Sequence, residues 1–520
     1  MKFMSNRQII KGALILSTAG VVAKILSAIY RIPLENFVGN TGFYVYQQVY
    51  PIYGLGMTLA LNGLPVFISK LISEKATLTE QLVTSKIIFK YLMVLGVGLW
   101  AGLMLGSSLI AKLMGDVNLA HVIMAVSWMF LFLPILATGR GLAQGQHDMR
   151  PTAFSQVIEQ IVRVLIIIGV AYVAMKLKWN VYFMGMLAML SAPIAGGVAS
   201  LFFIKNVPLF LSKTISSTKK QRQQIKQRLL TEGILVSSLV GLLLILQLID
   251  SFSVRSALIS SGIPSEQAKA VKGIYDRAQP LVQFGLVLAT GFATSSLPSL
   301  RRLFLNKAQK VLRMTIMQLL KVTAWLAIMI TMGLISLMPQ INQLLFGTRT
   351  NSWTLAVYML TIISMSLLLI LTSILQSIEQ TQSLGPGLII AIGIKGALNT
   401  ILVEKLGIMG ASITTVCALV GMLSYIWLHV YQQLLLNGPL LKSFMLKLVG
   451  QSLLMLVVVR FITTFLEQIY STSRSLTLVT IIIASSIGAS ISGYLLFKTK
   501  LLTVEEIEML PLGKKILKLR

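Results

Sequence analysis

The chain has 520 residues, of which 55% are hydrophobic and only 12% are charged. Soluble proteins carry about twice that charged fraction, so the composition excludes a soluble domain. The single cysteine, Cys417, excludes an intramolecular disulfide and a thiolate metal cluster. With a mean hydropathy of +0.82, the sequence predicts an all-α polytopic membrane protein.

Long apolar runs follow one another along the whole chain and predict about fourteen transmembrane helices. The first run, from Ile9, is too long for the apolar core of a signal peptide, so we expect it to be retained. The predicted spans are residues 9–30, 44–69, 84–111, 119–143, 152–175, 180–204, 232–254, 274–299, 314–338, 353–378, 385–403, 408–436, 443–466 and 475–497.

The formal net charge of +29 is explained by its distribution between the loops. If the N-terminus is cytoplasmic, roughly two thirds of the Lys and Arg residues fall in loops or tails on that side. The positive-inside rule therefore predicts both termini in the cytoplasm. The remaining effect of the charge is attraction to anionic lipid, and no nucleic-acid partner is needed to explain it.

Three sequence patterns from the first half return in the same order in the second half. "GALILSTAG" from Gly12 resembles "GILVSSLVG" from Gly233, and "GFYVYQQVYP" from Gly42 resembles "GIYDRAQP" from Gly273. "LAQGQHDMRP" likewise resembles "IEQTQSLGP". Because six spans separate the copies, the halves are expected to be parallel repeats that enclose a site near the membrane midplane.

The repeats divide the chain into two lobes and three further segments. The connection between the lobes holds seven basic residues and is predicted to lie as an amphipathic segment on the cytoplasmic surface. The expected parts are an N-lobe at 1–204, this linker at 205–231, a C-lobe at 232–436, two C-terminal helices at 437–499 and a basic cytoplasmic tail at 500–520.

These repeats, with "AKILSAIYRIP" (23–33), "GLPVFISKL" (63–71) and "YDR" (275–277), indicate a family. The chain resembles the multidrug/oligosaccharidyl-lipid/polysaccharide exporter superfamily, in the branch of stage V sporulation protein B and the MurJ-type lipid II flippases. The resemblance implies an ATP-independent flippase of a bacterial cell membrane. Its substrate would be a polyprenyl-pyrophosphate saccharide or peptidoglycan precursor, moved by alternating access.

Cationic residues inside spans are the first candidates for binding such a pyrophosphate, because burying a charge in a membrane is costly. Lys24 and Arg31 are seven residues apart and are expected on one face of the first span; the alternative for each is snorkelling to the helix end. Arg277 resembles the cavity arginine of the family. Asp276 could orient Arg277, pair with Arg31 or bind a coupling cation, and the alternative is that both residues mark a helix end.

The second predicted span carries an unusually polar face. Tyr46, Tyr50 and Tyr53 follow helical spacing, and Gln47 and Gln48 lie beside them. Such side chains can stack on and hydrogen-bond to sugar rings. Packing between lobes together with an interfacial aromatic belt is an equal alternative.

Four further charged residues complete the candidates. Arg255 ends the seventh span and either extends the polar zone or lies at the membrane interface. Lys395 has no acidic partner in its own helix and is a candidate for holding a lipid phosphate. Glu159 and Arg163, four residues apart, are expected to form an intrahelical ion pair.

Other functions fit the sequence less well. There is no nucleotide-binding G-x-x-x-x-G-K-[ST] motif, and the histidines are scattered, so we expect neither a pump driven by ATP nor an enzyme, and no cofactor or metal. A drug/cation antiporter of the same superfamily is the main alternative. The candidate residues are net cationic, which favours an anionic substrate. The expected partners are the lipid-linked saccharide and membrane lipids, and the sequence leaves open a coupling ion, Na⁺ or H⁺.

Overall fold

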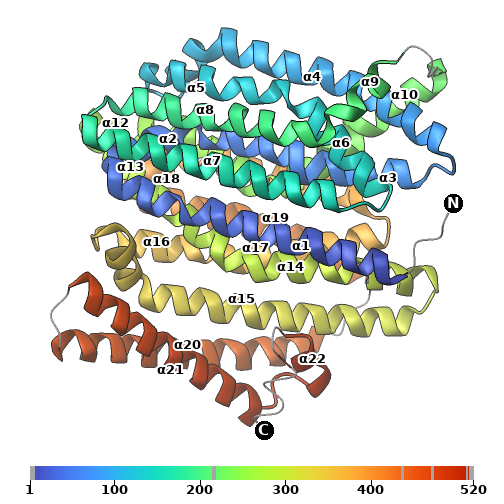
Figure 1. The fold of residues 1–520 in the computed structure, drawn as a ribbon. Coiled ribbons are helices and arrows are strands. Elements are labelled where there is room, and N and C mark those ends of the chain that lie inside the picture. The colour runs from blue at the N-terminus through green and yellow to red at the C-terminus, as the bar shows by residue number, and fades with distance from the viewer. Residues whose placement is uncertain (1–5, 213–217, 435–437, 470–472, 511–512, 514–520) are drawn as a thin grey trace. The chain divides into compact units, whose positions relative to one another are not determined.

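The computed structural model describes residues 6–212, 218–434, 438–469, 473–510 and 513, and every element in these ranges is helical (Figure 1). Helices dominate because a bilayer offers no water to backbone N–H and C=O groups, and a helix satisfies them within its own segment. The predicted all-α membrane fold is confirmed.

The structure does not confirm the number of spans that the sequence predicted. Across the described residues, eleven helical segments are long and apolar enough to cross a membrane, or twelve if the bent pair Val117–Leu131 and Leu133–Gly145 is one span. One of these segments, Thr18–Ser73, is 56 residues long and contains the second predicted span and most of the first. The count of fourteen is therefore not confirmed.

The chain forms two compact units. The first contains residues 1–276 and 399–405. Its helices are α1 (Asn6–Ile29), α2 (Arg31–Met57), α3 (Leu64–Ser73), α4 (Leu78–Leu113), α5 (Ala120–Ser127), α6 (Leu133–Gly145), α7 (Arg150–Leu177), α8 (Val181–Ser200), α9 (Val207–Leu211), α10 (Lys219–Arg228), α11 (Ile234–Val240), α12 (Leu242–Ser260) and α13 (Ser265–Asp276).

The second unit contains residues 277–398 and 406–520. Its helices are α14 (Ala278–Leu305), α15 (Gln309–Phe346), α16 (Ser352–Met359), α17 (Thr361–Ser377), most of α18 (Leu384–Leu406), α19 (Ile408–Leu434), α20 (Gly438–Ile469), α21 (Arg474–Lys498) and α22 (Val504–Glu508).

The division falls at Asp276, beyond the linker, so that α12 and α13 pack with the first unit. The segment 205–231 includes the short α9 and the polar α10, in which Ile225 is the buried residue; its place on the cytoplasmic surface stays a prediction. The six-helix repeat was inferred from sequence similarity. The packing of the helices does not test it, so it stays a prediction.

Helix α2 forms the centre of the first unit. Every residue from Gly42 to Gly54 is buried, as expected for a helix surrounded by others on all sides. The helix bends at Gly39, which has φ 68° and ψ −179°, a conformation that glycine adopts without a Cβ clash. This bend separates the first turns of α2 from the buried part, so the second predicted span begins beyond it.

A π-helical segment, Thr58–Gly63, joins α2 to α3. In the π pattern the carbonyl of Ala60 would accept a hydrogen bond from residue 65, but Pro65 has no N–H. The buried Arg140 on α6 donates to this carbonyl instead, from Nη1 at 3.0 Å. The proline thus frees an acceptor that a neighbouring helix uses.

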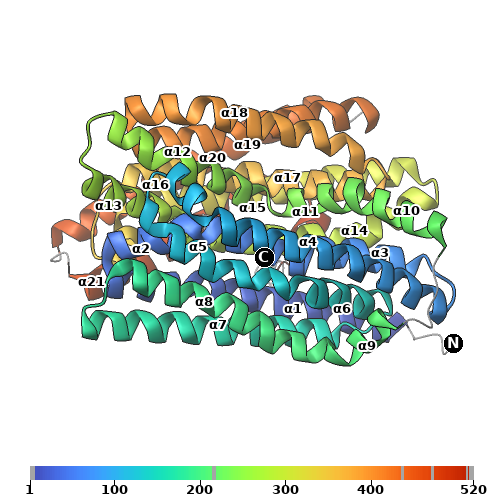
Figure 2. The same cartoon turned by 90° about the horizontal axis from the view of Figure 1, so that it is seen from above.

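In the second unit, α15 packs against α14, α17, α20 and α21, and α18 lies beside α19 (Figure 2). The short α22 begins with a capping box between Thr503 and Glu506. The Glu506 carboxylate also lies 3.2 Å from Nζ of Lys321 on α15. This ion pair and the capping box fix α22 against the unit.

Candidate functional site

The tyrosines predicted on one face of α2 do lie together, inside the first unit. The ring centroids of Tyr46 and Tyr50 are 6.2 Å apart, and those of Tyr50 and Tyr53 are 5.6 Å apart. All three are at most 5% exposed. They line a group that we call the arginine–tyrosine cluster, consisting of Tyr30, Arg31, Tyr46, Tyr50, Tyr53 and Arg163.

Arg163, on α7, is bound by the tyrosines. Its Nη2 donates to the hydroxyls of Tyr30 at 2.7 Å and Tyr46 at 2.6 Å, and its guanidinium carbon lies 3.7 Å from the ring centroid of Tyr53. Cation–π contacts of this kind are worth about 2 kcal/mol when water is excluded. Arg163 therefore has both hydrogen-bond and aromatic partners.

The expected intrahelical ion pair between Glu159 and Arg163 is wrong. The Glu159 carboxylate pairs instead with Nη2 of Arg140, at 2.6 Å and with both side chains buried. Arg140 on α6 also donates to Ser155 and to the carbonyl of Ala60. Arg140 is buried and needs a negative partner, whereas tyrosines already bind Arg163. The Glu159 carboxylate therefore pairs with Arg140.

Arg31 has no hydrogen-bond partner for any of its three guanidinium nitrogens among the described residues, although it is 0% exposed. The Tyr30 hydroxyl lies near it without hydrogen-bond geometry. Its guanidinium carbon stands 4.1 Å from the ring centroid of Tyr50. Burying an unpaired cation costs several kcal/mol. A single cation–π contact offsets only about 2 kcal/mol of that cost.

Lys24 does not share the environment of Arg31. The helix α1 ends at Ile29 because Pro33, four residues later, cannot donate to its carbonyl. The backbone nevertheless stays helical at Tyr30, whose N–H donates to the Leu26 carbonyl and whose own carbonyl accepts from Leu34, so both cations lie in the continuous segment Thr18–Ser73. Lys24 is exposed, whereas Arg31 is fully buried, and the expectation of one shared face stays a prediction.

Gln47 and Gln48 are buried beside the cluster. Nε2 of Gln48 donates to the carbonyl of Ser251 on α12 at 2.5 Å, which holds α2 against α12. The side-chain oxygens of both glutamines have no hydrogen-bond partner among the described residues. The structure thus leaves two open acceptors on α2.

Asp276 ends α13 and forms an ion pair with Lys272, four residues earlier, at 2.5 Å. Its second oxygen, Oδ2, has no hydrogen-bond partner in the described part of the chain, and Arg31 is close enough to influence it electrostatically. The sequence missed Lys272 as the partner, although its spacing from Asp276 is that of a helical ion pair.

Arg255 joins α12 to neighbouring loops of the first unit. Its Nη1 donates to the carbonyl of Gly115, and its Nη2 donates to Ser265 at 2.8 Å. These contacts fit a packing role between α12, α13 and the turn after α4. Its proposed part in a substrate site is not tested.

Arg277 and Lys395 lie in the second unit, both at most 1% exposed. Nη1 of Arg277 donates to Asn342 at 3.0 Å and to Thr348 at 3.1 Å. Lys395 donates to the Ala411 carbonyl and to two hydroxyls of α19, those of Thr414 and Thr415. For Lys395 the geometry favours holding α18 against α19.

Sequence reasoning missed Tyr30, Arg140 and Arg163 as members of buried polar groups. Arg140 could have been found, because it stands inside a predicted span without an acidic residue nearby. Arg163 was hidden by Glu159, whose spacing suggested a local pair. Among the described residues, no three His, Cys, Asp or Glu side chains are grouped as metal ligands would be.

Comparison with known proteins places the sequence. A family model described as polysaccharide biosynthesis protein matches residues 9–304, which is more than half of the chain. The chain belongs to this polysaccharide biosynthesis protein family. Membership confirms the predicted superfamily and its polysaccharide transporter branch, and with the apolar helices it identifies a multi-pass membrane protein of bacterial type.

Individual relatives of this polysaccharide biosynthesis protein agree with that assignment. It is 34% identical over 517 residues to the uncharacterized membrane protein YabM of Bacillus subtilis, covering 98% of this chain and 96% of that protein. It is 27% identical over 451 residues to the lipid II flippase MurJ of the same organism, covering 81% and 82%. A solved structure of lipid II flippase MurJ in an inward closed conformation gives a TM-score of 0.69 at 15% identity over 94% of this chain and 99% of that one. The two proteins share a fold.

Proposed function

We propose that this protein is an ATP-independent flippase that moves a polyprenyl-pyrophosphate saccharide or peptidoglycan precursor across the cytoplasmic membrane by alternating access. The MurJ relative supports the substrate class, because that protein is named a lipid II flippase. The observation that carries the proposal for this chain is Arg31, a buried cation without a hydrogen-bond partner among the residues that the structure describes.

A pyrophosphate would supply what Arg31 lacks. The guanidinium carries five N–H donors in a planar fork that matches phosphate oxygens two at a time. A bound phosphate would therefore convert an uncompensated buried charge into a charge-assisted pair. Arg163 adds a second positive charge to the cluster, and its tyrosine partners leave that charge unneutralised.

Polar groups of the saccharide would use the open acceptors of α2. The side-chain oxygens of Gln47 and Gln48 can accept hydrogen bonds from sugar hydroxyls or amide N–H groups. The faces of Tyr50 and Tyr53 already contact guanidinium groups. We therefore assign the tyrosines to holding the arginines, and the glutamines to the sugar.

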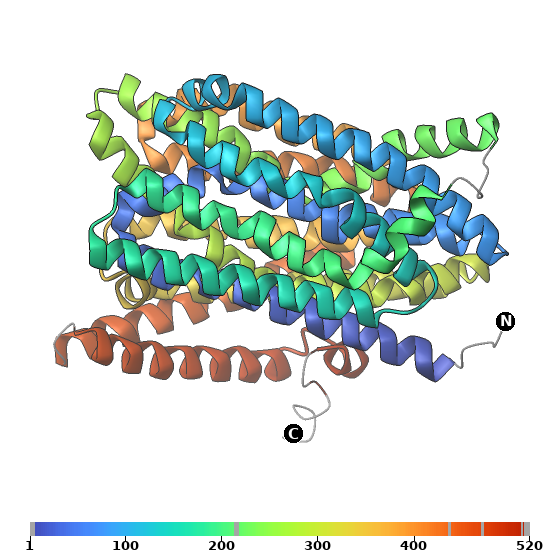
Figure 3. The same ribbon diagram turned by 45° about the horizontal axis from the view of Figure 1, so that its top comes forward.

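We also propose that both termini are cytoplasmic. The beginning of α1 and the basic α10, drawn in bright green, lie at the same end of the first unit (Figure 3). An even number of crossings between them would produce this arrangement, and the positive-inside rule then places that end in the cytoplasm.

The test is translocation of fluorescent lipid II in proteoliposomes, read by the fraction of head groups protected from an external quencher. The wild type should translocate it, and Arg31→Gln should reduce the rate at least tenfold. Arg222→Gln, an exposed arginine on α10, is the matched control and should keep the wild-type rate.

Two outcomes would contradict the proposal. Full activity of folded Arg31→Gln would remove the role of Arg31. Export of a cationic dye by the wild type, without movement of lipid II, would favour the drug/cation antiporter.

A further inference from the structure

The basic helix α10 docks on the first unit at the end where α3 turns into α4 (Figures 1 and 3). Five of its ten residues are Lys or Arg, and none is acidic. Ile225 is the residue that it buries, and the Tyr91 hydroxyl of α4 donates to the carbonyl of Arg222 at 3.4 Å. A helix this charged needs polar partners to stay attached.

Ion pairs supply polar partners for α10. Arg228 binds the Glu74 carboxylate through two nitrogens, at 2.6 and 3.1 Å, and its Nε donates to Glu232 at 2.9 Å. Lys70 also pairs with Glu232 at 2.9 Å. Hydrogen bonds to Glu74 raise the pKa of Arg228 above its usual range despite partial burial, and Glu232 adds to the effect.

This network is electrically balanced, because two carboxylates face two cations. Arg228 uses Nε, one hydrogen of Nη1 and both hydrogens of Nη2 in it, so one N–H on Nη1 remains. Lys75 stands next to Glu74 but forms no ion pair among those found in the described residues. The carboxylates of this network therefore do not balance the charge of Lys75.

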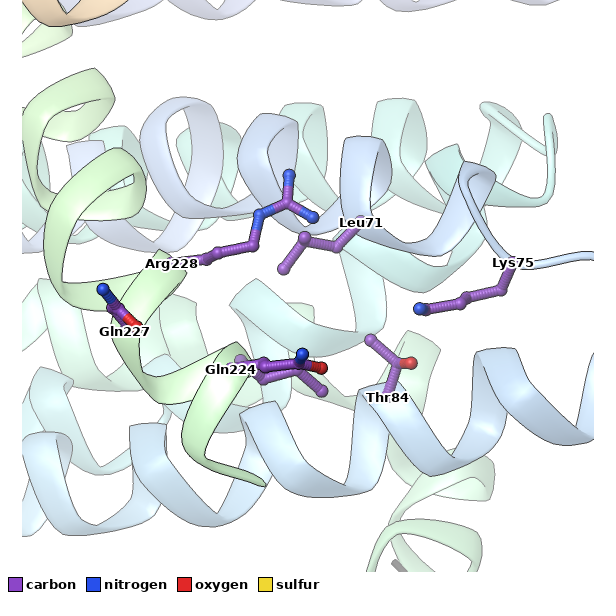
Figure 4. Close-up of a pocket in the computed structure, with 7 residues that line it drawn as sticks. Leu71, Lys75, Thr84, Gln224, Gln227 and Arg228 are labelled. Carbon is purple, nitrogen blue, oxygen red and sulfur yellow. The ribbon is translucent and has the colours of Figure 1, made fainter. Parts of the chain in front are cut away.

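A pocket of about 350 Å³ opens between the end of α3, α4 and α10 (Figure 4). The ammonium of Lys75 and the amide of Gln224 point into it, and the guanidinium of Arg228 borders it. Its seven lining residues are Leu71, Lys75, Thr84, Gln224, Ile225, Gln227 and Arg228.

We propose that this pocket binds the phosphate of an anionic phospholipid head group. Lys75, the remaining N–H of Arg228 and the Gln224 amide are donors for phosphate oxygens, while Leu71 and Ile225 offer apolar surface to the glycerol. The pocket lies where the apolar segments Thr18–Ser73 and Leu78–Leu113 end, the depth at which head groups lie. Basic pockets between membrane helices on the cytoplasmic side are typical sites for anionic lipids.

The test is native mass spectrometry of the purified full-length protein titrated with phosphatidylglycerol or phosphatidylcholine, together with its melting temperature in each lipid. The wild type should bind phosphatidylglycerol more tightly and melt higher in it. Lys75→Gln should weaken that binding about fivefold, the effect of one surface lysine. Lys90→Gln, an exposed lysine further along α4, should bind as the wild type does.

A second variant guards against misfolding of the first. Gln224→Glu changes an exposed side chain and places a negative charge in the pocket, so it should weaken phosphatidylglycerol binding at least as much. Equal binding of both lipids by the wild type, or unchanged binding by folded Lys75→Gln and Gln224→Glu, would overturn the proposal. If inorganic phosphate raised the melting temperature as much as phosphatidylglycerol, the assignment to a lipid would be overturned.

Discussion

Arg140 and Glu159, on neighbouring helices α6 and α7, form a fully buried ion pair with 2.6 Å between Nη2 and Oε2. The same arginine donates to the carbonyl that Pro65 leaves without a partner. One side chain therefore joins α6, α7 and the π-helical segment, and its removal tests how much the first unit depends on this junction.

Arg140→Leu should lower the free energy of unfolding by about 3–5 kcal/mol, because it leaves the Glu159 carboxylate buried and unpaired. The double variant Arg140→Leu/Glu159→Leu should recover most of that loss, since no buried charge remains. Thermal unfolding in detergent, with equal lipid in every sample, measures both. A double variant less stable than Arg140→Leu would contradict the explanation.

Removing the charge of Arg31 and removing that of Arg163 should have different effects on the melting temperature. Arg31→Leu should leave the melting temperature unchanged or raise it, because the guanidinium has no hydrogen bond to lose within the described part of the chain. Arg163→Leu should lower it, because two tyrosine hydroxyls lose their buried donor. A large loss of stability in Arg31→Leu would mean that this arginine is structural.

Gly63 permits a close approach between the π-helical segment and α11. A Cβ there would lie 2.4 Å from Oγ and 2.8 Å from Cα of Ser237, so backbone would have to move. Gly63→Ala should destabilise the protein by about 1–3 kcal/mol. Gly98→Ala on α4, where nothing lies within 4 Å, is the matched control and should be neutral or slightly stabilising; equal melting temperatures would refute the contact.

The stability of the protein should depend on the hydrogen bonds from Lys395 to the hydroxyls of α19. Thr415→Val removes the acceptor 2.7 Å from its ammonium while keeping the shape of the side chain, and should cost about 1–3 kcal/mol. Ser485→Ala, an exposed hydroxyl on α21 that bonds only its own helix, is the control. If Thr415→Val melted at the wild-type temperature, Lys395 would not need this acceptor.

The attachment of α10 should weaken in acid. Burial alone would raise the pKa of Glu232, but hydrogen bonds from Arg228 and Lys70 lower it. A lowered folded pKa means that the stabilisation is complete above the unfolded value, about 4.3, and is lost as the pH falls through the folded value. The protection factors of the α10 amides, which correct for the intrinsic pH dependence of hydrogen exchange, should therefore fall below about pH 4 and remain constant from pH 6 to 8.

A variant separates this titration from general acid unfolding. Glu232→Gln should show fast exchange of α10 already at pH 7, with exchange in α4 unchanged. Slow exchange of α10 in that variant would show that the ion pairs of Glu232 do not hold the helix.

Apolar runs predicted the membrane fold because hydrophobic length alone decides whether a segment can cross a bilayer. Helical spacing likewise placed Tyr46, Tyr50 and Tyr53 on one side of α2, as the structure has them. These predictions need only local geometry.

Partners of charged residues were harder to predict, because a buried charge selects the best-placed group in three dimensions. Glu159 took an arginine nineteen residues away in preference to the one on its own helix. A long-range contact thus decided between arrangements that the sequence allowed equally.

The boundary between the units after Asp276 has a consequence for the course of the chain. The 205–231 segment begins and ends within the first unit, so it would travel with that unit as part of one body. The backbone passes from one unit to the other at the peptide bond between Asp276 and Arg277, and again within α18. An insertion in the basic segment would therefore lengthen a connection inside the first unit and leave the connections between the units unchanged.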